Sequence, residues 1–257
     1  MTRIVALANQ KGGVGKTTTA INLGASLAAC ERKVLLIDLD PQANATSGTG
    51  LPKNEAQSMY AVLLDGMPLR TVIRQTDLPS LQVAPSSVDL VGAELELGGT
   101  AQREFRLKNA IAGAVGEYDY ILIDLPPSLG LLTINGLTAA DSVLVPMQCE
   151  YFAMEGVSQL LNTIERVCDS LNPSLEIEGI VLTMYDDRMN LARQVAEEVR
   201  NHFGEKVYRT LIPRNVRLGE APSFGKPIIL YDIRSRGSEA YVSLAKEFIR
   251  RAENVVA

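Results

Sequence analysis

The chain has 257 residues, of which 46% are hydrophobic and 21% charged, so it carries enough apolar material to bury a sizeable core. Its 20 glycines and 12 prolines are near ordinary usage and no segment is compositionally biased, which excludes collagen, coiled-coil rods and low-complexity proteins. The 3 cysteines show no CxxC spacing, and no apolar run approaches the roughly 18 residues of a membrane-spanning helix. We therefore expect a globular protein of the reducing cytoplasm.

The net charge argues at first against nucleic acid as a partner. With 25 basic and 30 acidic residues the formal charge is -5, the wrong sign for a protein held to nucleic acid by bulk charge. The total hides an asymmetry, because residues 1–185 hold 12 basic and 20 acidic side chains, whereas residues 186–257 hold 13 and 10. The excess of positive charge is thus confined to the C-terminal part of the chain.

Short apolar runs alternate with helical patterns along the chain, and strands of this kind bury both faces. This pattern predicts an α/β fold with a mainly parallel twisted sheet and helices on both of its faces. The predicted strands are 4–8, 34–38, 81–85, 120–124, 142–147, 177–184 and 206–213. The predicted helices are 20–29, 101–115, 154–171 and 237–252, with extra helices inserted at about 51–75. Because no linker or internal repeat interrupts this order, we expect one domain over residues 1–257.

The first predicted strand runs directly into a glycine-rich loop and then a helix, which is the context that a phosphate-binding loop requires. Glycines let backbone N–H groups converge on phosphate oxygens, and the following helix turns its positive end toward them. Lys16 would neutralise the β- and γ-phosphates, and the Thr17 hydroxyl would bind Mg²⁺. We expect the nucleotide to lie against Lys11, Gly12, Gly13, Val14, Gly15, Lys16, Thr17 and Thr18.

Carboxylates end two of the predicted strands. Asp38 and Asp40 are two residues apart, so they project to the same side and can converge on one site. Asp124 ends the strand 120–124, where a carboxylate can hold a Mg²⁺-bound water. Each aspartate alone also fits an ordinary strand-ending turn. Beside the phosphate loop, however, the three predict a Mg²⁺-nucleotide site.

The loop departs from the usual GxxxxGK[ST] pattern, because Gln10 occupies the first glycine position and Lys11 is an additional lysine. Lys-Gly-Gly-Val-Gly-Lys-Thr resembles the deviant Walker A motif of the ParA/MinD family of P-loop ATPases. The resemblance covers nearly the whole chain and is closest to the small chromosomal ParA proteins called Soj. Beyond the nucleotide motifs it includes DLDPQANATSG at 38–48, GLLTINGLTAAD at 130–141, QCEYFAMEG at 148–156 and the segment 212–236.

This resemblance assigns roles to the motif residues. Lys11 would reach across a nucleotide-sandwich homodimer to the partner's phosphates, and Gly12 would lie where the two chains approach closely. Asp40 would orient or activate the attacking water, and Asp38 would lie near the Mg²⁺ shell. The expected catalytic residues are therefore Lys11, Lys16 and Asp40, and the expected metal-site residues are Thr17, Asp38 and Asp124.

An absent lysine indicates which base is bound. Guanine-specific relatives use an [NT]KxD sequence, whereas the corresponding segment here reads Thr183-Met184-Tyr185-Asp186. The missing lysine favours ATP. In the resembling family the adenine lies against this segment and against Pro213-Arg214-Asn215, which makes Met184 and Pro213 the expected base contacts.

In the resembling family, ATP-bound dimers bind double-stranded DNA without sequence preference, and a ParB-type centromere-binding partner stimulates hydrolysis and releases them. Such binding needs only a few basic side chains against phosphates, so a net-acidic protein can bind DNA through one face. Arg188 and Arg217 match positions that Soj-type proteins use for DNA, and the weaker candidates are Arg214, Arg234, Arg236 and Arg250. The resemblance implies a nucleoid-associated ATPase for chromosome or plasmid partition, with a replication initiator as a further candidate partner.

Two alternatives share the nucleotide motifs. A MinD-like membrane ATPase carries a C-terminal amphipathic membrane helix, but the tail SLAKEFIRRAENVVA mixes acidic with basic residues and has no Trp, so it predicts a core-packing helix and no membrane partner. An iron–sulfur ATPase needs a cysteine pair at the subunit junction, and Cys149 and Cys168 do not match that family's motifs. The DNA-partitioning ATPase is the preferred interpretation.

Overall fold

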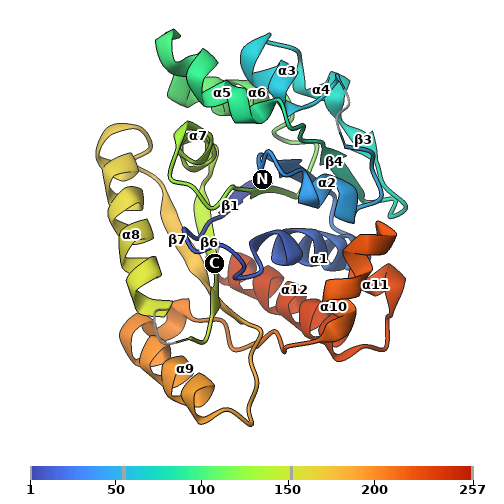
Figure 1. Cartoon of the computed structure of the whole chain (residues 1–257), viewed down its shortest axis with the longest axis vertical. Helices are drawn as coiled ribbons and strands as arrows, with labels where there is room; N and C mark the ends of the chain where they lie inside the picture. Colours follow the sequence, from blue (N-terminus) through green and yellow to red (C-terminus); the bar gives the residue numbers. More distant parts are fainter. Residues whose placement is uncertain (1, 54–55, 151–152, 256–257) are drawn as a thin grey trace.

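The computed structural model describes residues 2–53, 56–150 and 153–255. It consists of a central sheet with helices packed on both faces (Figure 1). Tyr151 and Phe152, which belong to the family-like segment 148–156, lie outside the described residues.

The sheet has seven strands in the order β3-β4-β2-β5-β1-β6-β7. β3 pairs antiparallel with β4, and the other neighbours are parallel, so the predicted fold class is confirmed. Every residue of β2 and β5 is buried, as expected for strands covered on both faces. The strands are β1 (Arg3–Leu7), β2 (Val34–Asp38), β3 (Arg74–Gln75), β4 (Leu81–Ala84), β5 (Tyr120–Asp124), β6 (Ser142–Gln148) and β7 (Glu176–Thr183).

Alternate residues of each strand face different helices, because side chains point to opposite faces of a sheet in turn. The helices are α1 (Lys16–Ala29), α2 (Asn44–Gly48), α3 (Met59–Leu64), α4 (Leu69–Val72), α5 (Leu90–Glu96), α6 (Arg106–Ile111), α7 (Leu131–Ala139), α8 (Ala153–Ser170), α9 (Asn190–Phe203), α10 (Val216–Glu220), α11 (Ile228–Tyr231) and α12 (Arg236–Val255). Short 3₁₀ turns lie at Leu97–Gly99, Arg103–Phe105, Gly204–Lys206 and Ala221–Phe224. Across the described residues, no helix has the length and apolar character needed to cross a bilayer.

One face is covered by α1 and α12, which lie side by side in the lower right of Figure 1. Tyr241, Leu244 and Phe248 of α12 are fully or almost fully buried in the core that α1 shares with the strands. This confirms that the tail is a core-packing helix. The other face is covered chiefly by α3 and by α5 to α9, whose apolar side chains form a second core with the alternate strand residues.

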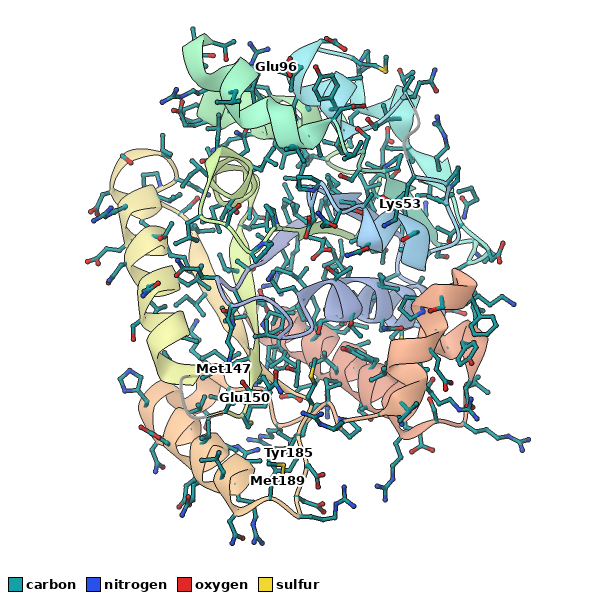
Figure 2. The ribbon with its side chains drawn as sticks, in the orientation of Figure 1. Lys53, Glu96, Met147, Glu150, Tyr185 and Met189 are labelled. Atoms are coloured by element: carbon teal, nitrogen blue, oxygen red, sulfur yellow. The ribbon has the colours of Figure 1, made fainter. Side chains whose placement is uncertain are left out.

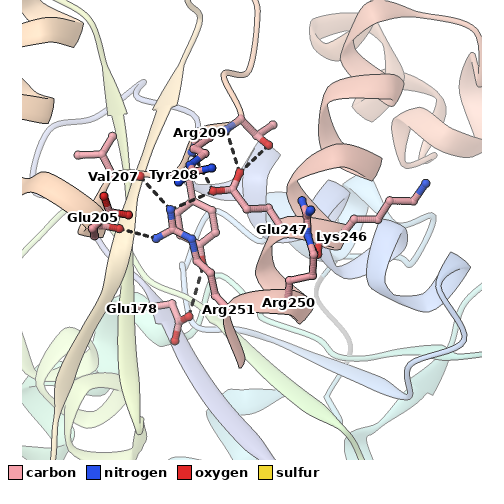
Figure 3. A network of polar contacts seen from close by, with 10 residues as sticks. Glu178, Glu205, Val207, Tyr208, Arg209, Lys246, Glu247, Arg250 and Arg251 are labelled. Atoms are coloured by element: carbon pink, nitrogen blue, oxygen red, sulfur yellow. Dashed lines mark hydrogen bonds and ion pairs between the residues drawn. The ribbon is translucent and has the colours of Figure 1, made fainter. Parts of the chain in front are cut away.

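The predicted strand 206–213 is wrong as a sheet strand, since this segment forms only isolated bridges at Val207 and Pro213. The backbone N–H groups of Tyr208 and Ile212 still donate to β7 carbonyls. Between them, the N–H groups of Arg209 and Thr210 donate to the Glu247 carboxylate of α12, at 2.8 and 2.9 Å. The Thr210 N–H, which a continued ladder would have directed to β7, therefore pairs with the buried side chain of Glu247 (Figure 3).

The register brings the predicted site residues to one edge of the sheet. β5 lies between β2 and β1, and Asp124 is aligned with Asp38 on one side and with Leu7 on the other. The phosphate loop follows β1 directly, so it emerges at the same edge as both carboxylates. In parallel sheets this carboxyl edge is where ligands bind.

Gly179 provides a test of the packing of β7 against residues 206–208. It follows a register irregularity, has φ of +155°, and an added Cβ would lie 2.6 Å from the Lys206 carbonyl oxygen. Because that neighbour is backbone, Gly179→Ala should lower the free energy of unfolding by about 1–3 kcal/mol in a denaturant titration. Gly113→Ala, whose Cβ would meet no atom within 4 Å, is the control and should change it by less than about 0.5 kcal/mol. Equal stabilities of the two variants would contradict this packing.

Candidate active site

The loop between β1 and α1 is anchored to the ends of two neighbouring strands. The Asn9 side-chain amide donates to the Pro146 carbonyl oxygen at 2.8 Å, and its oxygen accepts from the Lys11 N–H at 3.0 Å. On the other side, the Thr183 hydroxyl donates to the Val14 carbonyl oxygen at 2.7 Å. These buried contacts hold the loop in a single shape before any ligand binds.

The loop borders open space and offers unused N–H donors. A Cβ added to Gly12 or Gly13 would meet no atom within 4 Å. Gly15 has φ of 85°, in the left-handed region that favours glycine, and no side chain caps the first turn of α1. An uncapped helix of 14 residues behind an open glycine loop is suited to bind phosphate. The predicted nucleotide loop, Lys11 to Thr18, therefore has the geometry that its sequence suggested.

Lys16 lies in this loop and is only 7% exposed. Its ammonium lies 3.4 Å from the Lys11 carbonyl oxygen. Burial lowers its pKa, while the nearby carboxylates of Asp124 and Asp40 act in the opposite direction. Lys16 and the two aspartates thus belong to one electrostatic cluster.

Asp124 is the least satisfied charge of this cluster. It is fully buried, and within residues 2–53, 56–150 and 153–255 neither carboxylate oxygen accepts a well-formed hydrogen bond, although the Thr17 hydroxyl lies near them. Burial, followed by the negative charge of Asp38, raises its pKa well above the usual value, although the Thr17 hydroxyl and Lys16 oppose that shift. A buried carboxylate without partners is costly, and a hard divalent cation with oxygen ligands would remove that cost. Asp124 and Thr17 therefore fit a Mg²⁺ site.

The Asp38 carboxylate accepts its hydrogen bonds from the loop that follows β2. One carboxylate oxygen accepts from the N–H and the hydroxyl of Thr46 at 2.8 and 2.7 Å, and the other accepts from the Asp40 N–H at 3.1 Å. Burial raises its pKa to about 6 despite these hydrogen bonds. Its place near a Mg²⁺ shell stays a prediction. Sequence reasoning missed Thr46, whose only signal was a hydroxyl in the family-like segment after Asp40.

The Asp40 carboxylate accepts fewer hydrogen bonds than the Asp38 carboxylate. It is 8% exposed, and its Oδ1 accepts from the Gln42 N–H at 2.9 Å. No hydrogen bond to its other oxygen is present among the described residues. Asp40 therefore retains an acceptor beside Lys16 that could bind a water molecule.

Lys11 is paired within its own chain. Its ammonium forms an ion pair of 2.5 Å with Glu150, just beyond Met147 of β6 (Figure 2). Both side chains are well exposed, at 38% and 45%. Sequence reasoning missed Glu150 as a partner, because nothing local connects two residues so far apart in the chain.

The two predicted base contacts lie near the loop. Met184 has a left-handed backbone with φ of 49°, and its terminal methyl group lies 3.8 Å from the Cβ position of Gly15. Tyr185 and Pro213 form an isolated bridge, which brings the segments containing Met184 and Pro213 side by side. These segments are therefore adjacent at the end of β7.

The two principal DNA candidates follow this bridge in the chain: Arg188 comes three residues after Tyr185, before α9, and Arg217 comes four after Pro213, in α10. Arg188 is 85% exposed and forms two hydrogen bonds with Asp186, at 2.9 and 2.7 Å. Arg217 is 54% exposed and forms an ion pair with Glu220 at 2.8 Å and a longer one with Asp232 at 3.6 Å. Both cations are accessible, but each is neutralised by local carboxylates.

The weaker DNA candidates are divided between two edges of the sheet. Arg214 is exposed close to Asp186, whose pKa its charge helps to lower, after the larger effect of Arg188. Arg234 and Arg236 are exposed at the start of α12. Arg250, in contrast, lines a cavity of about 970 Å³ with Arg3 and Ser142, the first residues of β1 and β6. The structure therefore does not bring Arg250 together with Arg188 and Arg217.

Comparisons with known proteins agree on the type of site. Residues 2–177 match the model of a family described as "AAA domain". The chain is 58% identical to the chromosome partitioning protein ParA of Caulobacter vibrioides, over 97% of this chain and 94% of that protein. It is also 58% identical to the sporulation initiation inhibitor protein Soj of Bacillus subtilis, over 96% and 98% of the two chains. A solved structure, cobyrinic acid a,c-diamide synthase from Mycobacterium smegmatis with bound ADP and magnesium, is similar with a TM-score of 0.86, 40% identity and coverage of 98% and 96%.

The Asp124 carboxylate gives a prediction about pH. Because its pKa is raised in the folded state, the folded chain binds more protons than the unfolded chain, and stability falls as pH rises from about 4 through that raised pKa. In EDTA and without nucleotide, Asp124→Asn should therefore melt at a higher temperature than wild type at about pH 7.5, and the difference should shrink toward about pH 4. Added Mg²⁺-ATP should stabilise wild type and not the variant.

The control for this melt is Asp77→Asn, which removes an exposed carboxylate away from the site. It should follow the wild-type pH dependence. If wild type and Asp124→Asn have the same melting temperature at every pH, then burial does not destabilise the Asp124 carboxylate.

Proposed function

The chain belongs to the ParA family of chromosome-partitioning ATPases, and we propose that it is a Mg²⁺-ATP-driven switch that binds DNA as a dimer. Two chains would close over two ATP molecules and bind double-stranded DNA without sequence preference. Hydrolysis, stimulated by a ParB-type partner, would then release the DNA. The observation that carries this proposal is the unpartnered, fully buried Asp124 carboxylate beside the phosphate loop.

ATP is the substrate that this site fits best. The open glycine loop and the first turn of α1 supply N–H donors for the phosphates, and Lys16 supplies a buried positive charge. Thr17 and Asp124 would hold Mg²⁺, which when bound neutralises phosphate charge and orients the γ-phosphate. The similar solved structure with ADP and magnesium supports this pairing of nucleotide and metal.

Asp40 is the residue that we propose for positioning the attacking water. The water oxygen would bond to the γ-phosphorus as the bond from that phosphorus to the β,γ-bridging oxygen breaks, giving ADP and phosphate. The free acceptor of Asp40 would hold the water through one of its protons. Intrinsic hydrolysis should be slow, because one chain alone would lack the positive charge that its partner supplies.

Lys11 and Gly12 are the residues that we propose for the dimer. Exposed ion pairs contribute little stability, so Lys11 could leave Glu150 for a partner's phosphate at small cost. Gly12 has neither a positive φ nor any neighbour that a Cβ would touch. Among the described residues nothing therefore prevents a side chain at Gly12, and a close approach of a second chain would explain glycine at this position.

Arg188 and Arg217 are the residues that we propose for DNA. In the single chain each is neutralised by a nearby acid, and the overall charge is -5, so one copy should bind DNA weakly. Dimerisation doubles every phosphate contact, and each contact releases counterions from the DNA. ATP would then promote DNA binding because a dimer carries twice as many DNA-contacting arginines as one chain, without any change in the surface of each chain.

A MinD-like role at a membrane is less well supported. The apolar side chains Tyr241, Leu244 and Phe248 of α12 are buried against the rest of the chain, so these residues have no apolar face left for a bilayer. The nucleoid rather than a membrane is the proposed location.

Binding to DNA with ATP, with ADP and without nucleotide tests the whole proposal. Wild type should bind cooperatively only with ATP. Gly12→Val should bind ATP but not DNA, because the added side chain blocks the approach of the second chain. Asp40→Ala should accumulate as an ATP-bound dimer on DNA, because it loses the group that positions the attacking water. Size-exclusion chromatography with light scattering measures the dimer, and fluorescence anisotropy measures DNA binding.

Two controls separate dimerisation from folding. Gly12→Val should melt at the wild-type temperature, since a Cβ there meets nothing in the chain. Lys16→Ala should lose nucleotide binding and therefore both later steps. Cooperative, ATP-dependent DNA binding by Gly12→Val would rule out the sandwich dimer.

A salt titration tests the arginines separately. In Arg217→Ala the plot of the logarithm of the DNA binding constant against the logarithm of salt concentration should become shallower by about 0.9 per lost phosphate contact. Arg188→Ala should behave alike. Arg166→Ala removes an exposed arginine on α8 and is the matched control. An unchanged slope in both test variants would remove Arg188 and Arg217 from the DNA-binding surface.

A further inference from the structure

The segment that follows β4 contacts the loop that follows β2 and carries Asp40, which we call the catalytic loop. The Ser86 hydroxyl donates to the Asp40 carbonyl oxygen at 2.7 Å, and the Ser86 N–H donates to the Thr46 hydroxyl oxygen at 3.0 Å. The Thr46 hydroxyl in turn donates to Asp38. Ser86, Thr46 and Asp38 are fully buried. Asp40 is therefore connected to β4 through a chain of hydrogen bonds that water does not reach.

The loop that carries Asp40 needs such a support. Ala43 has a left-handed backbone with φ of 52°, which is unfavourable for a residue with a side chain. The Ala43 N–H donates to the Asp40 carbonyl oxygen at 2.9 Å, so this oxygen accepts two hydrogen bonds, one from within the loop and one from Ser86. A strained turn keeps its shape only when its surroundings hold it. Ser86 supplies that contact from a different strand.

The support is itself anchored to a helix. The Met59 N–H donates to the Pro85 carbonyl oxygen at 2.8 Å, and the Ser58 hydroxyl donates to the Ser87 hydroxyl oxygen at 3.2 Å. These contacts join the residues on both sides of Ser86 to the start of α3. Ser86 is thus also held by its neighbours, through contacts that do not involve the loop carrying Asp40.

We infer that Ser86 and Thr46 are positioning residues for ATP hydrolysis, which hold Asp40 in the orientation that places the attacking water. The inference rests on the proposed role of Asp40. Neither residue contacts the phosphate loop through a hydrogen bond in the described part of the chain, so their effect is on the rate of the chemical step and not on ATP binding. Small displacements of a catalytic group reduce rates strongly, while binding by the phosphate loop is unaffected.

Steady-state ATP hydrolysis at saturating DNA tests this inference. Ser86→Ala should lower kcat on the order of tenfold or more, because Asp40 is less well oriented. The KM for ATP should stay within about twofold of wild type. Ser238→Ala is the matched control, since Ser238 is also a buried serine but its hydroxyl has no hydrogen-bond partner. Both variants should melt at similar temperatures, which separates a positioning role from a loss of folding.

Two substitutions at Thr46 provide a second, independent test. Thr46→Val keeps the shape of the side chain and loses the hydroxyl, whereas Thr46→Ser keeps the hydroxyl. Thr46→Ser should retain most of the kcat that Thr46→Val loses. A kcat of Ser86→Ala within about twofold of the Ser238→Ala control would overturn the inference, as would a loss matched by an equal rise in KM. Failure of wild type to hydrolyse ATP would instead overturn the proposed function.

Discussion

A carboxylate that is buried without a partner is the constraint on which the rest of the site depends. The parallel register aligns Asp124 with Asp38, and the phosphate loop after β1 adds Lys16 and Thr17 beside them. One buried lysine does not satisfy this group of acids, since neither Asp124 oxygen accepts a well-formed hydrogen bond in the described part of the chain. The folded chain is therefore strained at the place where Mg²⁺ and ATP are proposed to bind. Ligand binding would relieve that strain, which couples occupancy of the site to stability.

The positively charged side chains outside this cluster lie at the protein surface, in ion pairs. Lys11, Arg188 and Arg217 each have an acidic partner in the same chain, and all three pairs are exposed. Exposed pairs are weak and exchange easily. In the proposed function, the chain alone would present little free positive charge to DNA or to a second copy. A stronger anion, such as a phosphate, would then compete for each cation only after ATP has brought two chains together.

Asp40 links these two features, because it lies in the acidic cluster and also belongs to a loop that is held from outside. Within the loop, the Thr46 N–H and hydroxyl donate to the Asp38 carboxylate. From the segment after β4, the Ser86 hydroxyl donates to the Asp40 carbonyl oxygen. The core around α1 and α12 and the core around α3 and α5 to α9 meet at the sheet that carries these contacts. In the proposed mechanism, the position of Asp40 would thus depend on the segment after β4, which lies outside the predicted site.

Local patterns in the sequence determined the elements whose physics is local. The glycine-rich loop, the apolar strands and the apolar side of α12 were all predictable, because backbone freedom and hydrophobic periodicity act within a few residues. α7 and α9 were not predicted, although Val195 and Val199 of α9 are buried at helical spacing. The periodic signal was therefore present in α9, whereas α7 is buried on most of its surface and shows no such pattern.

Only the tertiary structure decided the features that depend on partners distant in sequence. Glu247 accepts hydrogen bonds from the N–H groups of Arg209 and Thr210, where the predicted strand is interrupted. Glu150 pairs with Lys11, Ser86 supports Asp40, and Arg250 lies at the opposite edge of the sheet from Arg188. A hydrogen bond or ion pair between distant residues leaves no periodic trace in either segment. The sequence by itself therefore determined which chemistry this protein can carry, and the fold determined which side chains hold that chemistry in place.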